Sequence, residues 1–174
     1  TPKPSSAASD VYKRQAFGSA QLFTKHHVKI ISLAFFVAFF NQLSGINFLL
    51  YYAPRILEEA GFAKDNSLLS SISIGMMNLV FTFVGLWLID RIGRKTLLII
   101  GSFGYIISLS MVAYGFFMHS APTFMLVFLL LFIAAHAIGQ GAVIWVLISE
   151  IFPTQIRAAG QAFGASIHWI FAAL

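Results

Sequence analysis

The sequence predicts an all-α protein built as a bundle of several membrane-spanning helices. Hydrophobic residues make up 59% of its 174 residues and charged residues only 10%, whereas a soluble domain carries about 25% charged residues. The apolar residues form runs of about 20 or more, which is the length that a helix needs to cross a bilayer. Most charged residues lie in the short segments between these runs.

Five apolar segments are expected to span the membrane, the last of them truncated: residues 28–53, 67–89, 96–117, 123–148 and 158–174. The turn between the third and fourth spans is expected at His119–Pro122. Because the last apolar segment stops short of a full crossing, we expect the chain to be a fragment. Residues 1–15 are polar and lack a helical period, and we expect a non-native or disordered leader there.

The charges of the loops alternate along the chain. Three acids and two cations follow the first span, whereas the loop at residues 90–95 holds three cations and one acid. Lys and Arg concentrate on the cytoplasmic side of membrane proteins. This pattern places residues 16–29, 90–95 and 150–157 in the cytoplasm, with residues 16–27 as a segment before the first span.

Composition and motifs argue against several classes of protein. The chain has no Cys, so it has neither a disulfide framework nor a thiolate metal site. Its net charge of +5 is scattered between apolar runs, which does not favour nucleic acid as a partner. We find no nucleophile–base pair, phosphate loop or cluster of metal ligands. We therefore expect no enzyme activity, no cofactor and no metal.

The middle of the first span carries three side-chain amides: Asn41, Gln42 and Asn47. A polar group in hydrocarbon costs free energy unless it finds a partner, so these amides bond to neighbouring helices or face a polar cargo. With about 100° per residue, Asn41, Asn47 and Tyr51 share one face of a regular helix. Gln42 lies about 160° from Ser44, the centre of that face. A helix break just after Ser44 would let all three amides meet one cargo; otherwise Gln42 bonds to another helix.

The cytoplasmic loops also carry acids, which simple anchoring by cations does not explain. Acids at the helix ends could pair with Arg on neighbouring loops and hold the cytoplasmic side shut. The residues of this expected gate are Asp90, Arg91, Arg94, Lys95, Glu150 and Arg157.

Three motifs in order resemble the sugar porters of the major facilitator superfamily. They are Asn41–Asn47 with Tyr51–Pro54, then Asp90–Lys95, and then Gly141–Arg157, which includes Trp145. The resemblance covers about residues 20–174 and matches the C-terminal half of the family, helices seven to ten and the start of eleven. It implies the major facilitator fold, with residues 28–174 in the C-terminal half and a missing N-terminal half of six helices as partner.

The resemblance also implies which side chains contact sugar. In the family an Asn that matches Asn78 contacts sugar, and so do the positions that match His168 and Trp169. Trp145 offers a flat face for a sugar ring and an N–H for a hydroxyl, although an interfacial belt is the alternative. The full expected set is Asn41, Gln42, Asn47, Tyr51, Asn78, Gln140, Trp145, His168 and Trp169.

The chain departs from the family pattern at four positions near the expected site. Asn41 replaces a usual Gln, and Ala142 replaces a usual Pro. Gln140 stands where many members have an aromatic residue, and His168 where many have Asn or Gln. A sugar therefore remains the expected class of substrate, but these changes leave open which sugar it is.

The expected function is transport of a monosaccharide, such as a hexose or pentose, by alternating access as part of a larger protein. Sugar hydroxyls donate and accept hydrogen bonds, as amides do, and the interior of the spans holds no acid or base of fixed charge. The alternatives are a related polyol such as inositol, or a membrane assembly subunit that does not transport. Proton symport and facilitated diffusion both stay open. The expected location is multi-pass in a bacterial inner membrane or a plasma membrane.

Overall fold

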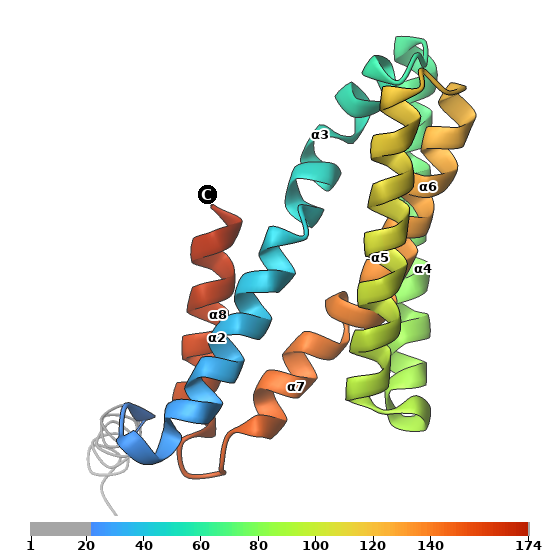
Figure 1. Cartoon of the computed structure of the whole chain (residues 1–174). Coiled ribbons are helices and arrows are strands. Elements are labelled where there is room, and N and C mark those ends of the chain that lie inside the picture. The colour runs from blue at the N-terminus through green and yellow to red at the C-terminus, as the bar shows by residue number, and fades with distance from the viewer. Residues whose placement is uncertain (1–21, 174) are drawn as a thin grey trace, which may run out of the picture. The chain divides into compact units, whose positions relative to one another are not determined.

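The computed structural model describes residues 22–173, so the expected leader at residues 1–15 and half of the segment at 16–27 lie outside the described residues. Every regular element of the described part is helical (Figure 1). The elements are η1 (Lys25–His27), α2 (Val28–Leu43), α3 (Ile46–Glu59), α4 (Lys64–Ile92), α5 (Arg94–Phe117), α6 (Pro122–His136), η2 (Ala137–Gly141), α7 (Val143–Ile151) and α8 (Arg157–Ala172).

Four helical segments of the described part are long and apolar enough to cross a membrane: Lys25–Glu59, Lys64–Ile92, Arg94–Phe117 and Pro122–Ile151. They lie where the first four spans were expected, and α8 lies at the fifth. The first segment continues past Pro54, whereas the sequence placed its end at residue 53. Burial of Leu57 against the core and an Arg55–Glu59 ion pair of 3.4 Å one turn apart stabilise this extra length.

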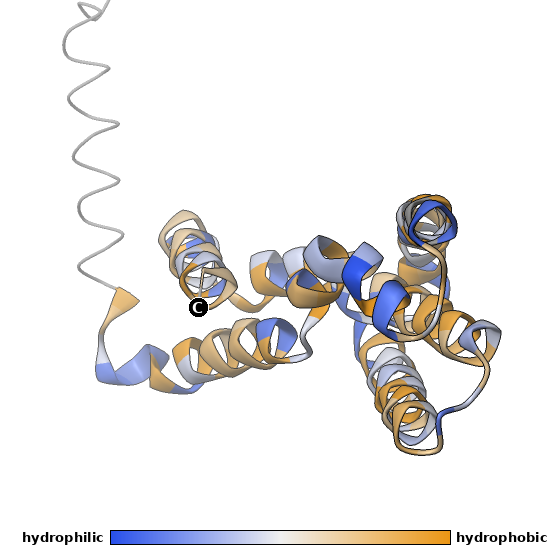
Figure 2. Cartoon of the chain, turned by 90° about the horizontal axis from the view of Figure 1, so that it is seen from above, coloured by the Kyte–Doolittle hydropathy of each residue, from blue (hydrophilic) through white to orange (hydrophobic). Residues whose placement is uncertain are grey.

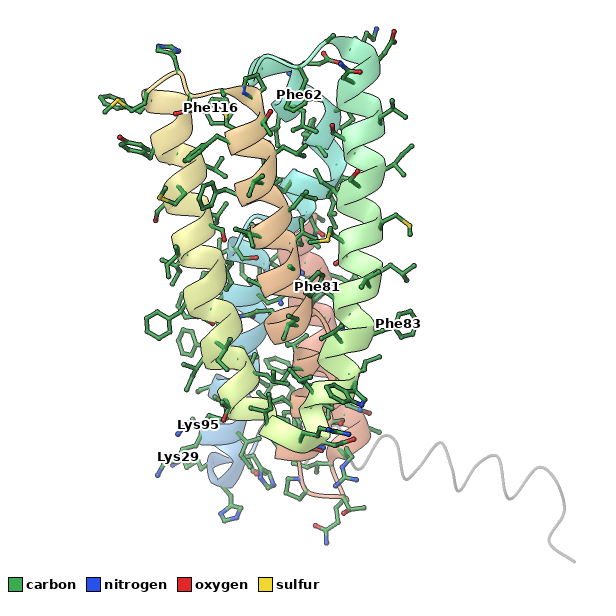
Figure 3. The ribbon with its side chains drawn as sticks, turned by 90° about the vertical axis from the view of Figure 1, so that its right-hand side faces the viewer. Lys29, Phe62, Phe81, Phe83, Lys95 and Phe116 are labelled. Carbon is green, nitrogen blue, oxygen red and sulfur yellow. The ribbon has the colours of Figure 1, made fainter. Side chains whose placement is uncertain are left out.

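Hydrophobic residues run around α2, α4, α5 and α6 instead of along one stripe (Figure 2). A helix that is apolar on all sides belongs in a membrane or a large core. Large apolar side chains are also exposed, such as Phe83, which points away from α4 (Figure 3).

The chain divides into two compact units, one of Thr1–Leu43 with Val146–Leu174 and one of Ser44–Trp145. In the second unit α4, α5 and α6 lie side by side (Figures 1 and 3). Their core includes Leu57, Ile74, Leu129, Phe132 and Ile133.

Glycines set how closely α5 packs against η2 in the second unit. A Cβ added at Gly101 would lie 2.6 Å from the Cα of Gly139 and 2.8 Å from the Ala135 carbonyl oxygen. The backbones therefore touch directly, and no side chain fits between them. Gly139 belongs to η2, which is a π-helical turn. In this turn the Ala142 N–H donates to the Ala137 carbonyl at 3.3 Å.

In the first unit α8 packs against α2 and against the end of α7. The Phe39 and Phe171 rings meet edge to face with centroids 4.7 Å apart, which joins α2 to α8. A Cβ on Gly160 would come within 2.3 Å of the Phe152 ring, and one on Gly164 within 2.9 Å of Ile148. These two glycines thus serve close packing inside the chain, as small residues spaced by four do in membrane helices.

Candidate functional site

The three amides of the first span lie around the end of α2 and the start of α3. The backbone breaks at Gly45, whose φ of 79° is left-handed, and α3 restarts with the Leu49 N–H donating to the Gly45 carbonyl at 3.0 Å. Glycine adopts this conformation without the steric cost that a Cβ brings. The break separates Asn41 and Gln42, which end the first unit, from Asn47 in the second.

Asn41, Gln42 and His168 form a polar cluster in the first unit. The Gln42 Nε2 donates to the Asn41 Oδ1 at 3.3 Å and lies 2.7 Å and 3.0 Å from the two ring nitrogens of His168. Asn41 and Gln42 are buried, and His168 is half-buried. The expected alternative for Gln42, a bond to another helix, is therefore present, and its partner is α8.

Trp169 adjoins this cluster on α8. Its ring meets the His168 ring edge to face with centroids 5.5 Å apart, and 64% of its surface is exposed. A large indole with an exposed face next to neutral hydrogen-bonding groups can stack on an apolar ring face.

The second unit holds Asn47, Tyr51, Asn78 and Trp145. Tyr51 is 77% exposed and Trp145 is 42% exposed. Asn47 and Asn78 are half-buried. These side chains can reach a ligand on the surface of the unit without any rearrangement of its core.

Gln140 lies in η2 and is 7% exposed. Its Nε2 donates to the Ser102 Oγ of α5 at 3.2 Å, beside the glycine contact between α5 and η2. Ser102 was not among the expected residues. The sequence shows a serine in the third span and an amide in the fourth, but it does not show that the two side chains meet. That becomes clear only from the packing of α5 against η2.

His136 ends α6 and is buried. Its Nδ1 lies 3.5 Å from the Ser44 Oγ, and its ring packs with those of Phe132 and Tyr105, whose centroids are 6.0 Å and 6.4 Å away. These contacts are those of a hydrogen-bonded histidine that packs against its neighbours.

An apolar cavity of about 440 Å³ lies between α3, α5 and α6. Its walls include Phe48, Leu109, Val112 and Leu129, with the Glu59 carboxyl among the few polar groups. None of the expected sugar contacts lines it. A cavity with so few hydrogen-bonding groups does not suit a polyhydroxylated ligand.

Four of the expected gate charges lie in the last turn of α4 and the first turn of α5, on either side of Gly93. Arg94 lies 3.4 Å from the Asp90 carboxylate and donates to the Ile89 carbonyl at 3.3 Å. Arg91 instead lies over the Trp87 ring, 4.0 Å from its centroid, as a cation–π contact. Asp90, Arg91 and Lys95 are exposed.

In the loop before α8, Arg157 donates to the Phe152 carbonyl at 3.4 Å. Both Arg157 and Glu150 are exposed. Within residues 22–173 no group of three His, Cys, Asp or Glu side chains could hold a metal ion. Exposed charged groups of this kind suit the water or the lipid headgroups at a membrane surface.

A family model described as "Sugar (and other) transporter" matches residues 5–174. The chain belongs to this family, the sugar porters. The D-xylose-proton symporter of Escherichia coli K12 is 36% identical over 143 residues, which are 82% of this chain and 29% of the relative. The glucose facilitated diffusion protein of Zymomonas mobilis is 39% identical over 134 residues, 77% of this chain and 28% of the relative.

Solved structures give the same assignment. The proton:xylose symporter XylE bound to 6-bromo-6-deoxy-D-glucose superposes with a TM-score of 0.75 at 36% identity, over 82% of this chain and 30% of that one. The xylose transporter XylE from E. coli, in a partially occluded inward-open conformation, superposes with a TM-score of 0.70 at 30% identity. The match covers 97% of this chain and 35% of that one.

The predicted fold class and family of this sugar porter are therefore confirmed: it is an all-α, multi-pass integral membrane protein of the major facilitator superfamily. The named relatives are transporters and not enzymes. This chain spans less than a third of the length of the two curated relatives described above.

Proposed function

We propose that this sugar porter chain is part of a transporter that moves a monosaccharide, such as a hexose or pentose, by alternating access, and that it has no enzyme activity. The cluster of Asn41, Gln42 and His168 carries this proposal, since it gathers hydrogen-bonding groups in two stretches, residues 30–53 and 158–174, that contain no Asp, Glu, Lys or Arg. Relatives that carry xylose, glucose and arabinose support the substrate class.

In this proposal residues 28–174 form the C-terminal half of the transporter, and six further helices of the same protein form the other half. The bilayer is the second partner, and nucleic acid is not one. The side chains that contact sugar are Asn41, Gln42, Asn47, Tyr51, Asn78, Gln140, Trp145, His168 and Trp169. The long amide-bearing helices supply hydrogen bonds, and the indoles supply stacking faces.

Substitution of Asn47 in the full-length protein tests the sugar site. Loss of one hydrogen bond to a neutral partner costs about 0.5–1.5 kcal/mol, so Asn47→Ala should weaken binding of D-glucose, D-xylose or arabinose by about 2- to 12-fold. The matched control is Asn66→Ala, which removes an exposed amide near the start of α4. Equal sugar affinity of the folded Asn47→Ala protein and the wild type would reject this role. Tighter binding of inositol than of any sugar would favour the polyol alternative.

We also propose that Asp90, Arg91, Arg94, Lys95, Glu150 and Arg157 act as a cytoplasmic gate that favours the outward-open state. Acids among the cytoplasmic cations support this, because anchoring needs only cations. Single exposed ion pairs contribute little, so the gate requires several charges together. Glu150→Gln should increase labelling of cysteines introduced on the cytoplasmic side, and unchanged labelling would leave these charges with a purely topological role.

A further inference from the structure

The apolar cavity of the second unit runs along α3 for about the thickness of one lipid leaflet. On α3 its wall extends from Phe48 to Glu59, a distance of about 16 Å along a helix that rises 1.5 Å per residue. The hydrocarbon core of a bilayer is about 30 Å thick, and one leaflet makes up half of it. The cavity volume of about 440 Å³ lies within the range of about 300–1,000 Å³ that is typical of ligand pockets.

The two ends of this cavity differ in their polarity and in their depth. Ser44 lines one end, beside the helix break, and the Glu59 carboxylate lines the other. Phe116 also lines the cavity, and it lies near Phe62 at the end of the unit opposite Lys95 (Figure 3). Since residues 90–95 are expected in the cytoplasm, the carboxylate is placed at the opposite surface of the bilayer.

A smaller cavity of about 240 Å³ continues the first at its charged end. The two cavities share Phe48, Ile56 and Glu59, and the smaller one adds Tyr52 and Arg55. The Arg55 Nε donates to the Glu59 carboxylate at 3.4 Å, with the two side chains 75% and 64% exposed. Within the described part of the chain this is the only hydrogen bond of the Arg55 guanidinium. A guanidinium has five N–H donors, so Arg55 can also bind an anion.

The charges at this mouth are complementary to a zwitterion that carries a phosphate and a primary ammonium. Arg binds phosphate through two parallel N–H bonds, and a carboxylate accepts N–H bonds from an ammonium group. An anionic headgroup or a fatty acid would instead bring a second negative charge to Glu59. A choline headgroup has no N–H to donate. An exposed ion pair contributes little to stability, so a headgroup can share Arg55 and Glu59 at small cost.

The apolar part of the cavity suits an acyl chain. Without an occupant its walls would lose their van der Waals contacts, and acyl chains are the apolar groups that surround a membrane-spanning unit. Lipid tails are about as apolar as Leu, so a chain gains little free energy by moving from the bilayer into the cavity. Selection between lipids therefore depends on the headgroup at Arg55 and Glu59.

We propose that these two cavities form a binding site for phosphatidylethanolamine. One acyl chain lies along α3, the phosphate binds Arg55, and the ammonium binds Glu59. A chain in this position packs against Phe48, just after the break at Gly45, and so supports the first turns of α3. This inference goes beyond sugar transport and does not depend on it.

The first arm of the test measures headgroup selectivity with the 174-residue chain in lipid nanodiscs. The discs contain equal amounts of phosphatidylethanolamine and phosphatidylcholine, and native mass spectrometry counts the lipids that stay bound to the released chain. The wild type should retain phosphatidylethanolamine about 2- to 5-fold better, which is the range of an exposed ion pair. Glu59→Gln should abolish this preference, and Arg55→Gln should lower the retention of both lipids.

Glu58→Gln is the matched control, because Glu58 adjoins Glu59 in the sequence but lines neither cavity. It should behave as the wild type. Equal retention of the two lipids by the wild type, or the same loss of preference in Glu58→Gln as in Glu59→Gln, would overturn the proposal.

The second arm locates the acyl chain with a phosphatidylethanolamine that carries a photoreactive diazirine in the middle of one chain. It should label Val112 and Leu129, which line the cavity and are only 8% and 1% exposed. Unlabelled phosphatidylethanolamine should suppress this labelling more than phosphatidylcholine does. Lipids that merely surround the protein reach Phe103 and Ile107 of α5, which are 64% and 59% exposed. Labelling of these outer positions alone would overturn the proposal.

The same labelling in the full-length protein separates a lipid from a protein occupant. Val112 should again be labelled. Labelling of Val112 in the 174-residue chain but not in the full-length protein would show that another helix fills the cavity, and the proposal would be wrong. Sugar binding tests the proposed function separately, because none of the expected sugar contacts lines the larger cavity.

Discussion

Replacing Gly101 by Ala should separate α5 from η2 and destabilise the second unit. The added Cβ would lie 2.6 Å from the Cα of Gly139 and 2.8 Å from the Ala135 carbonyl oxygen. Carbon atoms pack best at about 3.5–4.0 Å, so the shortfall is about 1 Å. Both obstacles are backbone atoms, and only a movement of the helices relieves the clash.

The cost has two parts. Overpacking of a filled interface typically costs about 1–3 kcal/mol. A displacement of this size also stretches the neighbouring bond from Gln140 to Ser102, now 3.2 Å long, and its loss costs about 0.5–1.5 kcal/mol. We therefore expect Gly101→Ala to lower the free energy of unfolding by about 2–4 kcal/mol.

Reversible unfolding of the chain in mixed micelles, followed by circular dichroism, measures this difference. Gly75→Ala is the matched control, because Gly75 lies within α4 and an added Cβ there meets no atom within 4 Å. Ala favours a helix interior over Gly by about 0.5–1 kcal/mol, so the control should be at least as stable as the wild type. A Gly101→Ala protein within about 0.5 kcal/mol of the wild type, against the 1–3 kcal/mol typical of overpacking, would refute the direct backbone contact.

Two further predictions concern the helix break and the indole of α7. Gly45→Ala should cost about 1–2 kcal/mol, because its φ of 79° is left-handed, and Gly45→Asn should cost less; equal stability of all three proteins in the same unfolding assay would contradict this. In a full-length variant without Trp87 and Trp169, Trp145 fluorescence should change on addition of a bound sugar, since an indole that contacts the sugar changes its surroundings when the sugar binds. Quenching by brominated lipid tails without any response to sugar would assign Trp145 to an interfacial belt.

The membrane class, the first four spans and the family could be predicted from the sequence. These features depend on local composition, on loop charges and on motifs read along the chain. A break at Ser44–Gly45 was one of two alternatives, since it would let all three amides meet one cargo, and the other was a bond from Gln42 to another helix. The list of sugar contacts stays a prediction, since no ligand contact tests it.

Other features depend on which helices meet, and no local pattern contains that information. The partner of Gln42 lies 126 residues away on α8. The pairing of Gln140 with Ser102 joins positions 38 residues apart. The extension of α3 beyond Pro54 depends on burial of Leu57. Proline disfavours a helix interior, and the sequence alone does not show that this burial offsets its effect.

The π-helical turn of η2 changes how substitutions in the fourth span should be aligned. Its bond from residue 142 to residue 137 encloses one residue more than an α-helical turn does. Each residue of an α-helix advances the face by about 100°, so Trp145 is rotated by that angle relative to a continuous helix that begins at Pro122. A deletion of one residue at 137–141 could be absorbed as a regular α-turn, with the membrane length nearly kept. Such a deletion would turn every side chain of α7 to a new direction, so an insertion or deletion there acts as a change of face and not of length.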